Sequence, residues 1–227
     1  MNNAFPPWVP PRVAIAGSDQ VFPARRIWCV GQNYASHVLE MGNDPTRDPP
    51  FFFAKPPDAL TSGGFVPYPP ATADLHHEVE LVVALGPGAE IFGYAVGLDL
   101  TRRDLQAAAK AKGRPWTLGK GFDFAAPISP IARVSDVGHP RAGRIWLAVD
   151  GVVRQDGDLA QMTWSVEELL AQLARYVTLQ AGDLVFTGTP AGVGPLLPGA
   201  RLAGGVTGIG EIAVQIGPTG SVPAPSR

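Results

Sequence analysis

Turn-forming residues occur so often in this chain that long regular elements have little room. The 227 residues include 27 glycines and 24 prolines. Glycine readily adopts positive φ angles, whereas proline fixes φ and lacks an amide donor, so both residues interrupt helices and mark turns. The sequence therefore predicts many short strands joined by tight turns, with few helices.

The apolar segments between these turns have the pattern of strands. They are β-branched or alternating, and glycine, proline or aspartate bounds them. Asp150-Gly151 separates two of them and is a strong signal for a two-residue hairpin turn. We expect strands at Ile27–Val30, Glu78–Leu85, Tyr94–Leu98, Ile145–Val149, Val152–Gln155, Leu184–Thr187 and Glu211–Ile216.

Three helices are expected around these strands. Ser165 and Glu168 have the spacing of a capping box, and apolar side chains follow at helical spacing. A second helix is expected to begin with Thr101 as its cap and to run to about Lys112. A third, at Ala35–Met41, is short. Because strands outnumber the separated helices, the sequence predicts a mixed α+β fold that is predominantly β, rather than repeating βαβ units.

Composition excludes several classes of function. The net charge is −2 and no basic stripe is present, so nucleic acid is not an expected partner. Cys29 is the only cysteine, which rules out an intrachain disulfide. The longest apolar stretches, such as Leu81–Leu85, are far shorter than the ~20 residues of a membrane helix. The N-terminus lacks the pattern of a signal peptide, and we therefore expect a cytoplasmic protein.

The chain shows no internal repeat and no low-complexity linker between globular halves. Its proline-rich beginning and its last ten residues have the composition of loose ends. We expect residues 1–26 to form an N-terminal extension, residues 27–217 to form a single domain, and residues 218–227 to form a flexible tail.

Three acidic residues are expected at the ends of strands. Glu78 and Glu80 are two apart in a predicted strand, so their side chains lie on the same face. Carboxylates this close repel each other unless a proton or a cation lies between them. Asp99 follows another apolar strand, and three such carboxylates suit Mg²⁺ or Mn²⁺. The alternative is a solvated sheet face with Asp99 as an ordinary turn residue.

His37 and Glu40 are three residues apart on the short predicted helix and therefore share a face. A carboxylate beside a histidine holds its tautomer and raises its basicity, which suits the activation of a water molecule. A surface pair with no catalytic role is the alternative. The polar, turn-rich segment that follows this helix is a candidate mobile lid.

Seven segments, in the same order along the chain, resemble the fumarylacetoacetate hydrolase family. They extend over about four fifths of the chain, and the short acylpyruvase and fumarylpyruvate hydrolase branch is the most similar part of the family. The segments are GQNYASH (31–37), FAKP (53–56), HHEVEL (76–81), GYAVGLDLTRRD (93–104), GRPWTLGK (113–120), APIS (126–129) and FTGTPAGVG (186–194).

The resemblance implies a fold, a cofactor and a set of site residues. The fold would be the mixed β-sandwich or roll of the family's C-terminal domain, with peripheral helices and usually as a homodimer. Mg²⁺ or Mn²⁺ would be bound at the positions of Glu78, Glu80 and Asp99. The resemblance assigns His37, Glu40 and Lys120 to catalysis, and Gln32, Arg103, Gln106 and Thr189 to substrate binding.

The implied activity is metal-dependent hydrolysis of a carbon–carbon bond in a 3-acylpyruvate, a 2,4-dioxo acid. Fumarylpyruvate, cleaved to fumarate and pyruvate in the catabolism of aromatic compounds, is the best single candidate. The alternative is decarboxylation of oxaloacetate or a related β-keto acid, or keto–enol tautomerisation, at the same metal site. The pair His37 and Glu40 favours hydrolysis, because only hydrolysis needs an activated water. Gln32 replaces the arginine common in relatives and so bears on the choice of substrate.

Overall fold

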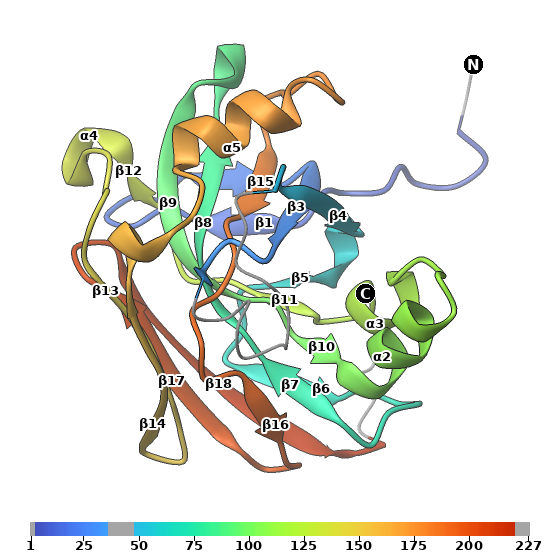
Figure 1. The fold of residues 1–227 in the computed structure, drawn as a ribbon. Coiled ribbons are helices and arrows are strands. Elements are labelled where there is room, and N and C mark those ends of the chain that lie inside the picture. The colour runs from blue at the N-terminus through green and yellow to red at the C-terminus, as the bar shows by residue number, and fades with distance from the viewer. Residues whose placement is uncertain (1–2, 36–47, 221–227) are drawn as a thin grey trace.

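The computed structural model describes residues 3–35 and 48–220, and its body consists of two large sheets (Figure 1). The six-stranded sheet has the order β12-β9-β8-β15-β3-β4, and the five-stranded sheet has the order β14-β13-β17-β18-β6. The first comprises β12 (Ala132–Arg133), β9 (Ile91–Leu98), β8 (Val79–Leu85), β15 (Asp183–Phe186), β3 (Arg26–Gly31) and β4 (Phe51–Lys55). The second comprises β14 (Val152–Asp158), β13 (Arg144–Val149), β17 (Arg201–Val206), β18 (Gly210–Thr219) and β6 (Phe65–Tyr68).

Three small sheets and short helices complete the fold. A three-stranded sheet has the order β10-β7-β16, and two pairs, β1-β2 and β11-β5, complete the strands. Their bounds are β10 (Thr101–Arg102), β7 (Leu75–His77), β16 (Gly194–Leu196), β1 (Arg12–Ala14), β2 (Val21–Pro23), β11 (Ala126–Pro127) and β5 (Leu60–Thr61). The helices are α2 (Arg103–Ala111), α3 (Thr117–Lys120), α4 (Val134–Val137) and α5 (Val166–Leu173), with single 3₁₀ turns at Pro57–Ala59, Pro87–Ala89 and Leu159–Gln161.

Strand β8 joins the two parts of the core, because it is buried on both faces. Leu81 and Val83 belong to a cluster that also contains residues of the five-stranded sheet, such as Leu147. Val82 and Ala84 point to the other face, into a second cluster that β1, β2, β3 and β15 help to form. All seven residues of β8 are buried, as expected of a central strand that reads as a continuous apolar run.

The expected fold class is confirmed: strands dominate and the few helices lie at the periphery (Figure 1). Each of the seven expected strands is present, with its ends shifted by at most a few residues. The hairpin is also confirmed, since β13 and β14 pair in antiparallel and Asp150 and Gly151 have φ angles of 50° and 79°. Ser165 caps α5 and forms the expected capping box with Glu168.

One expected helix start is wrong. Thr101 does not cap α2, because it lies in β10, and the helix begins two residues later at Arg103. The Thr101 hydroxyl instead donates hydrogen bonds to Glu78 and to the Asp99 carbonyl. The third expected helix, Ala35–Met41, has all but its first residue outside the described residues.

Described residues before Arg26 contribute to the core. Val13 and Phe22, within the segment expected to be an N-terminal extension, are buried in the second core cluster. The boundaries at residues 26 and 217 stay a prediction. No helix in the described part of the chain is both long and apolar enough to span a membrane.

Candidate metal and substrate site

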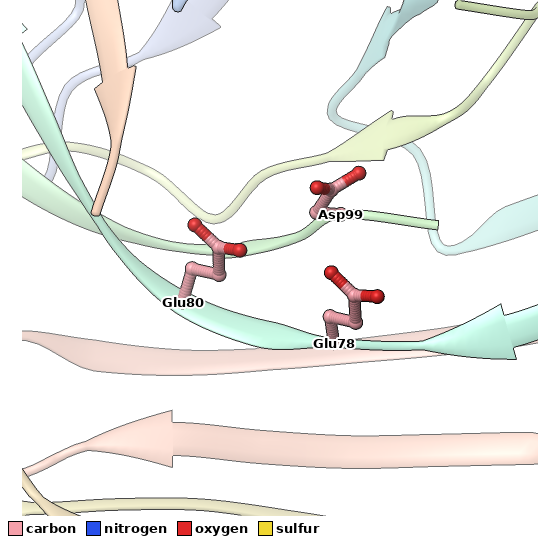
Figure 2. Close-up of side chains that lie close together, drawn as sticks. All are labelled: Glu78, Glu80 and Asp99. Atoms are coloured by element: carbon pink, nitrogen blue, oxygen red, sulfur yellow. The ribbon is translucent and has the colours of Figure 1, made fainter. Parts of the chain in front are cut away.

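Three buried carboxylates meet where β8 and β9 lie side by side (Figure 2). Glu78 immediately precedes β8, Glu80 lies within it, and Asp99 immediately follows β9. The antiparallel register pairs Glu80 with Gly97, and the Asp99 amide donates to the Glu78 carbonyl at 2.8 Å. One oxygen of each carboxylate lies within 4.8 Å of those of the other two. The two glutamates point to one face, as their spacing predicts.

The electrostatics of this cluster favour a cation. The pKa of Glu80 is raised well above its usual value, first by burial and then by repulsion from Asp99 and Glu78. The Gly188 amide, which donates to Glu80 at 2.7 Å, offsets only part of this effect. Asp99 Oδ1 is buried and accepts no hydrogen bond from the described residues, although Lys55 Nζ lies 2.8 Å away as an ion pair. An all-carboxylate donor set with an open lone pair fits Mg²⁺ or Mn²⁺.

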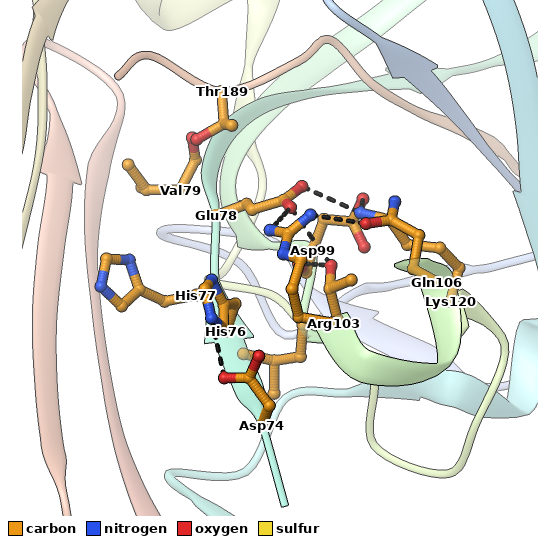
Figure 3. Close-up of polar contacts among 12 residues, drawn as sticks. Asp74, His76, His77, Glu78, Val79, Asp99, Arg103, Gln106, Lys120 and Thr189 are labelled. Carbon is orange, nitrogen blue, oxygen red and sulfur yellow. Dashed lines mark hydrogen bonds and ion pairs between the residues drawn. The ribbon is translucent and has the colours of Figure 1, made fainter. Parts of the chain in front are cut away.

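Lys120, at the end of α3, bridges two of the carboxylates (Figure 3). Its Nζ lies 2.9 Å from Glu78 and 2.6 Å from Asp99. Burial alone would lower the pKa of Lys120, but the two carboxylates outweigh burial and raise it, so the side chain is an ammonium. Gly119 allows α3 to approach α2, because a Cβ there would lie 3.0 Å from the backbone of Gln106.

Helix α2 contributes two further polar side chains. Arg103 forms an ion pair with Glu78 and donates to the Gln106 side chain at 2.6 Å (Figure 3). Of the two adjacent arginines, Arg103 is the one that lines the site, at a position that the family resemblance assigns to substrate binding. Arg102 instead lies over the ring of Phe122, 4.4 Å from its centroid.

Thr189 lies in the turn after β15, and its hydroxyl is held by backbone and side-chain partners. It donates to the Val79 carbonyl at 2.7 Å and accepts from Gln155 Nε2 at 2.7 Å. The side-chain oxygen of Gln155, Oε1, accepts a hydrogen bond from the Val79 amide and lies 2.9 Å from His77 Nδ1. Gln155, fully buried, therefore fixes this turn against the start of β8.

These side chains line a single pocket. One wall is aromatic, formed by Phe51, Phe53 and Trp116. It adjoins the carboxylates, because Lys120 Nζ, which pairs with two of them, lies 5.0 Å from the centroid of the Phe53 ring. Of the expected site residues that the structure describes, all line this pocket: Gln32, Glu78, Glu80, Asp99, Arg103, Gln106, Lys120 and Thr189. His37 and Glu40 lie outside the described residues. The individual roles of these residues stay predictions.

Two buried residues of the site were missed by sequence interpretation. Lys55 Nζ lies 2.8 Å from Asp99 Oδ1 and donates to the carbonyls of Leu100 and Lys120. Its presence in the segment FAKP (53–56) was a signal that could have identified it. Gln155 gave no comparable signal, because it lies in a strand whose other side chains are mostly exposed.

The comparisons with known proteins agree with this geometry. The family described as fumarylacetoacetate (FAA) hydrolase C-terminal matches residues 26–217. A crystal structure of fumarylpyruvate hydrolase from Pseudomonas aeruginosa, in complex with Mn²⁺ and pyruvate, is 48% identical and has a TM-score of 0.93, covering 96% of this chain and 100% of that one.

Two curated relatives carry different activities in their names. A fumarylpyruvate hydrolase from Ralstonia sp. is 42% identical over 186 residues, which is 77% of this chain and 96% of the relative. A mitochondrial oxaloacetate tautomerase from Arabidopsis thaliana is 40% identical over 201 residues, which is 84% of this chain and 90% of the relative. The match to the family model spans most of the chain, and the chain belongs to the fumarylacetoacetate hydrolase family.

Proposed function

We propose that this protein is a metal-dependent hydrolase that cleaves a carbon–carbon bond in 3-acylpyruvates, with fumarylpyruvate as its principal substrate. The observation that carries the proposal is the 48% identity, over 96% of this chain, to a fumarylpyruvate hydrolase described in complex with Mn²⁺ and pyruvate. Pyruvate is one of the two products of the proposed reaction.

The charge of the pocket supports an anionic substrate. Lys55, Arg103 and Lys120 together balance the three carboxylates when these are ionised. A bound divalent cation therefore leaves the site with a net positive charge, which suits a substrate with two carboxylates. Bound Mg²⁺ or Mn²⁺ supplies Lewis acidity that polarises the 2-oxo group and stabilises negative charge on oxygen. We assign Glu78, Glu80 and Asp99 as its ligands.

The proposed reaction is a hydrolysis in which side chains of this protein stabilise charge and transfer protons. A water oxygen bonds to the acyl carbonyl carbon, and the bond between that carbon and the pyruvate methylene breaks. The bonding electrons pass to the pyruvate portion, which takes up a proton, and the acyl portion leaves as fumarate. Lys120, as an ammonium, stabilises the developing oxyanion, an effect typically worth about 3–4 kcal/mol. His37, supported by Glu40, is proposed to accept the proton of the attacking water.

The proposal is tested with fumarylpyruvate and acetylpyruvate, by following the loss of ultraviolet absorbance of the enolised dioxo acid. We expect loss that requires Mg²⁺ or Mn²⁺, stops with EDTA, and yields pyruvate with fumarate or acetate in equal amounts. Glu80→Ala should abolish metal binding and turnover together, whereas Glu90→Ala, at an exposed position, should leave both intact. Metal-independent cleavage, or full turnover by Glu80→Ala, contradicts the proposal.

Oxaloacetate tautomerisation or decarboxylation is the second candidate, supported by the tautomerase name of the relative from Arabidopsis thaliana. Both reactions use the same metal site and need no attacking water. His37→Ala separates the two readings: a hydrolase should lose orders of magnitude in rate while still binding the metal. Oxaloacetate turnover without acylpyruvate cleavage by the unmodified enzyme would favour the second candidate.

We also propose a cytoplasmic homodimer that acts in the catabolism of aromatic compounds. The family resemblance supports the dimer, and the single buried cysteine suits a reducing compartment. Light scattering on the purified protein measures the dimer directly, and a monomer at micromolar concentration would contradict it.

A further inference from the structure

Helix α2 presents three side chains to the substrate pocket from one face. Arg103, Gln106 and Lys110 follow one another at spacings of three and four residues, and each of them lines the pocket. Arg103 and Gln106 are bonded to each other at the carboxylate end, whereas Lys110 is exposed. Within the part of the chain that the structure describes, Lys110 has no ion-pair partner.

The position of Lys110 suits the far end of an extended substrate. Its backbone lies about 10 Å farther along the helix axis than that of Arg103, from a rise of ~1.5 Å per residue. A seven-carbon dicarboxylate is about 8 Å long when extended, given C–C bonds of ~1.5 Å. The flexible four-carbon stem of lysine covers the remaining difference. A substrate of this length can therefore extend along α2 from the level of Arg103 to that of Lys110.

The pocket that these residues share also has an aromatic wall. Phe51 and Trp116 meet edge to face with their ring centroids 5.0 Å apart, and Phe53 lies 6.0 Å from Trp116. Such a wall packs against the flat, unsaturated middle of a chain, but apart from the indole N–H of Trp116 it offers a carboxylate no donor and no charge. A carboxylate at the far end of the acyl chain therefore needs a cationic partner elsewhere in the lining. Arg103 and Lys120 already pair with carboxylates of the site, which leaves Lys110.

We propose that Lys110 binds the terminal carboxylate of the acyl group and so selects acylpyruvates that end in a second carboxylate. This inference rests on the proposed hydrolase function and adds to it the residue that recognises the second carboxylate. Lys110 acts on recognition and takes no part in bond cleavage. It should therefore lower KM for dicarboxylate substrates and leave the chemical step unchanged.

Arg114 is the competing cation. It lines an adjoining hollow together with Phe52, Pro115 and Thr117, and this hollow shares only the aromatic wall and Lys120 with the pocket. Lys110 is preferred because it lines the same pocket as the three carboxylates, whereas Arg114 does not. The two assignments therefore predict different results: Lys110→Met changes substrate selectivity if Lys110 binds the carboxylate, and Arg114→Met does so if Arg114 binds it.

The test compares fumarylpyruvate, which has a terminal carboxylate, with acetylpyruvate, which has none, in four variants. Lys110→Met should lower kcat/KM for fumarylpyruvate by about tenfold, mainly through KM, because a charge-assisted hydrogen bond is lost. Its kcat/KM for acetylpyruvate should change less than about twofold, and Lys110→Arg should restore most of the selectivity. Lys112→Met, an exposed lysine on the same helix end, is the matched control.

Several outcomes overturn the inference. If Lys110→Met lowers kcat/KM equally for both substrates, Lys110 has a structural role. If it does not lower kcat/KM for fumarylpyruvate, Lys110 has no role in recognition. A selective loss in Arg114→Met, with Lys110→Met unaffected, would place the terminal carboxylate in the adjoining hollow. In each of these cases the unmodified enzyme still cleaves both substrates, and the proposed function stands. Absence of cleavage by the unmodified enzyme is the separate result that contradicts the function itself.

Discussion

Lys55 connects three parts of the site through one buried ammonium group. It pairs with Asp99 and donates to the carbonyls of Leu100 and Lys120, and its side chain is inaccessible to solvent. Lys55→Met leaves the Asp99 carboxylate and both carbonyls without this partner. Breaking a buried ion pair from one side typically costs about 3–5 kcal/mol. Urea denaturation of the metal-free protein should show a loss of this size.

The control for Lys55 is Lys112→Met, because Lys112 is exposed and should change the free energy of unfolding by less than about 0.5 kcal/mol. Excess Mg²⁺ should recover part of the stability lost in Lys55→Met, since a cation also compensates the Asp99 charge. A Lys55→Met protein as stable as its parent would show that the ion pair merely offsets its own desolvation.

Cys29 should be an unreactive thiol in the native protein. It is fully buried in β3, and burial raises its pKa well above the usual value, with Asp99 adding to the effect. Because the thiolate is the reactive form, Ellman's reagent should label native protein only as fast as the chain opens. Labelling should be immediate in denaturant. Rapid stoichiometric labelling of native protein at neutral pH would contradict the buried position.

The residues of the site differ in how readily the sequence predicts their place in it. Glu78 and Glu80 could be predicted as neighbours because strand geometry places residues i and i+2 on one face. Asp99 was placed near them only by inference from strand ends. Lys55 and Gln155 depend on partners 34 or more positions away along the chain. Such contacts cannot be inferred from the spacing of neighbouring residues, so only the family resemblance could indicate Lys55.

Gly97 in β9 keeps the backbone of the six-stranded sheet close to its neighbours. It pairs with Glu80, and a Cβ at this position would lie 2.5 Å from the Phe186 ring and 2.6 Å from Val82. Gly97→Ala should therefore destabilise the protein by about 1–3 kcal/mol, the usual cost of overpacking. Thermal denaturation measures the loss.

The matched control is Gly63→Ala, in an exposed turn where the nearest atom to a new Cβ, the Thr61 hydroxyl, lies 3.6 Å away. It should leave the melting temperature nearly unchanged. If both variants melt alike, the close contact at Gly97 relaxes at no cost and is not a constraint on the sheet.

The elements that sequence interpretation missed are those whose residues serve tertiary packing. Strand β17 contains two adjacent glycines, which are poor strand formers. A Cβ at Gly204 would meet Leu147 and the Trp146 carbonyl within 3 Å, so glycine is required by the adjacent strand rather than by a turn. The start of α2 was misplaced for a related reason: Thr101 has the side chain of a helix cap but uses it on Glu78.

At the scale of the molecule, one strand links the apolar core to the charged site. Leu81, Val82 and Val83 of β8 are fully buried between the two core clusters, and the two glutamates lie at the start of the same strand. The rigidity of this strand fixes the positions of carboxylates that repel one another. Repulsion among these buried carboxylates reduces the stability of the fold, and a bound cation removes this repulsion. Metal binding should therefore be coupled to the stability of the whole chain.

Mg²⁺ or Mn²⁺ should therefore raise the melting temperature, and the rise should grow with pH. A ligand that binds only the native state stabilises it by about 2.7 kcal/mol at a concentration of 100 Kd. The raised pKa of Glu80 means that, without metal, the native state holds this proton more tightly than the unfolded state does. The metal-free fold therefore loses stability as pH rises above the unfolded value of 4.5, whereas metal must displace the proton and binds better as pH rises.

Differential scanning fluorimetry with and without metal, at about pH 6 and about pH 8 and at constant ionic strength, measures this coupling. The gain in melting temperature should be larger at the higher pH in the parent protein. Glu80→Gln should lose most of the gain and its pH dependence, because the amide neither titrates nor supplies a charged ligand. Glu90→Gln, at an exposed position away from the site, should behave as the parent. An equal gain in Glu80→Gln and parent would place the cation elsewhere in the molecule and separate metal binding from the acidic cluster at the start of β8.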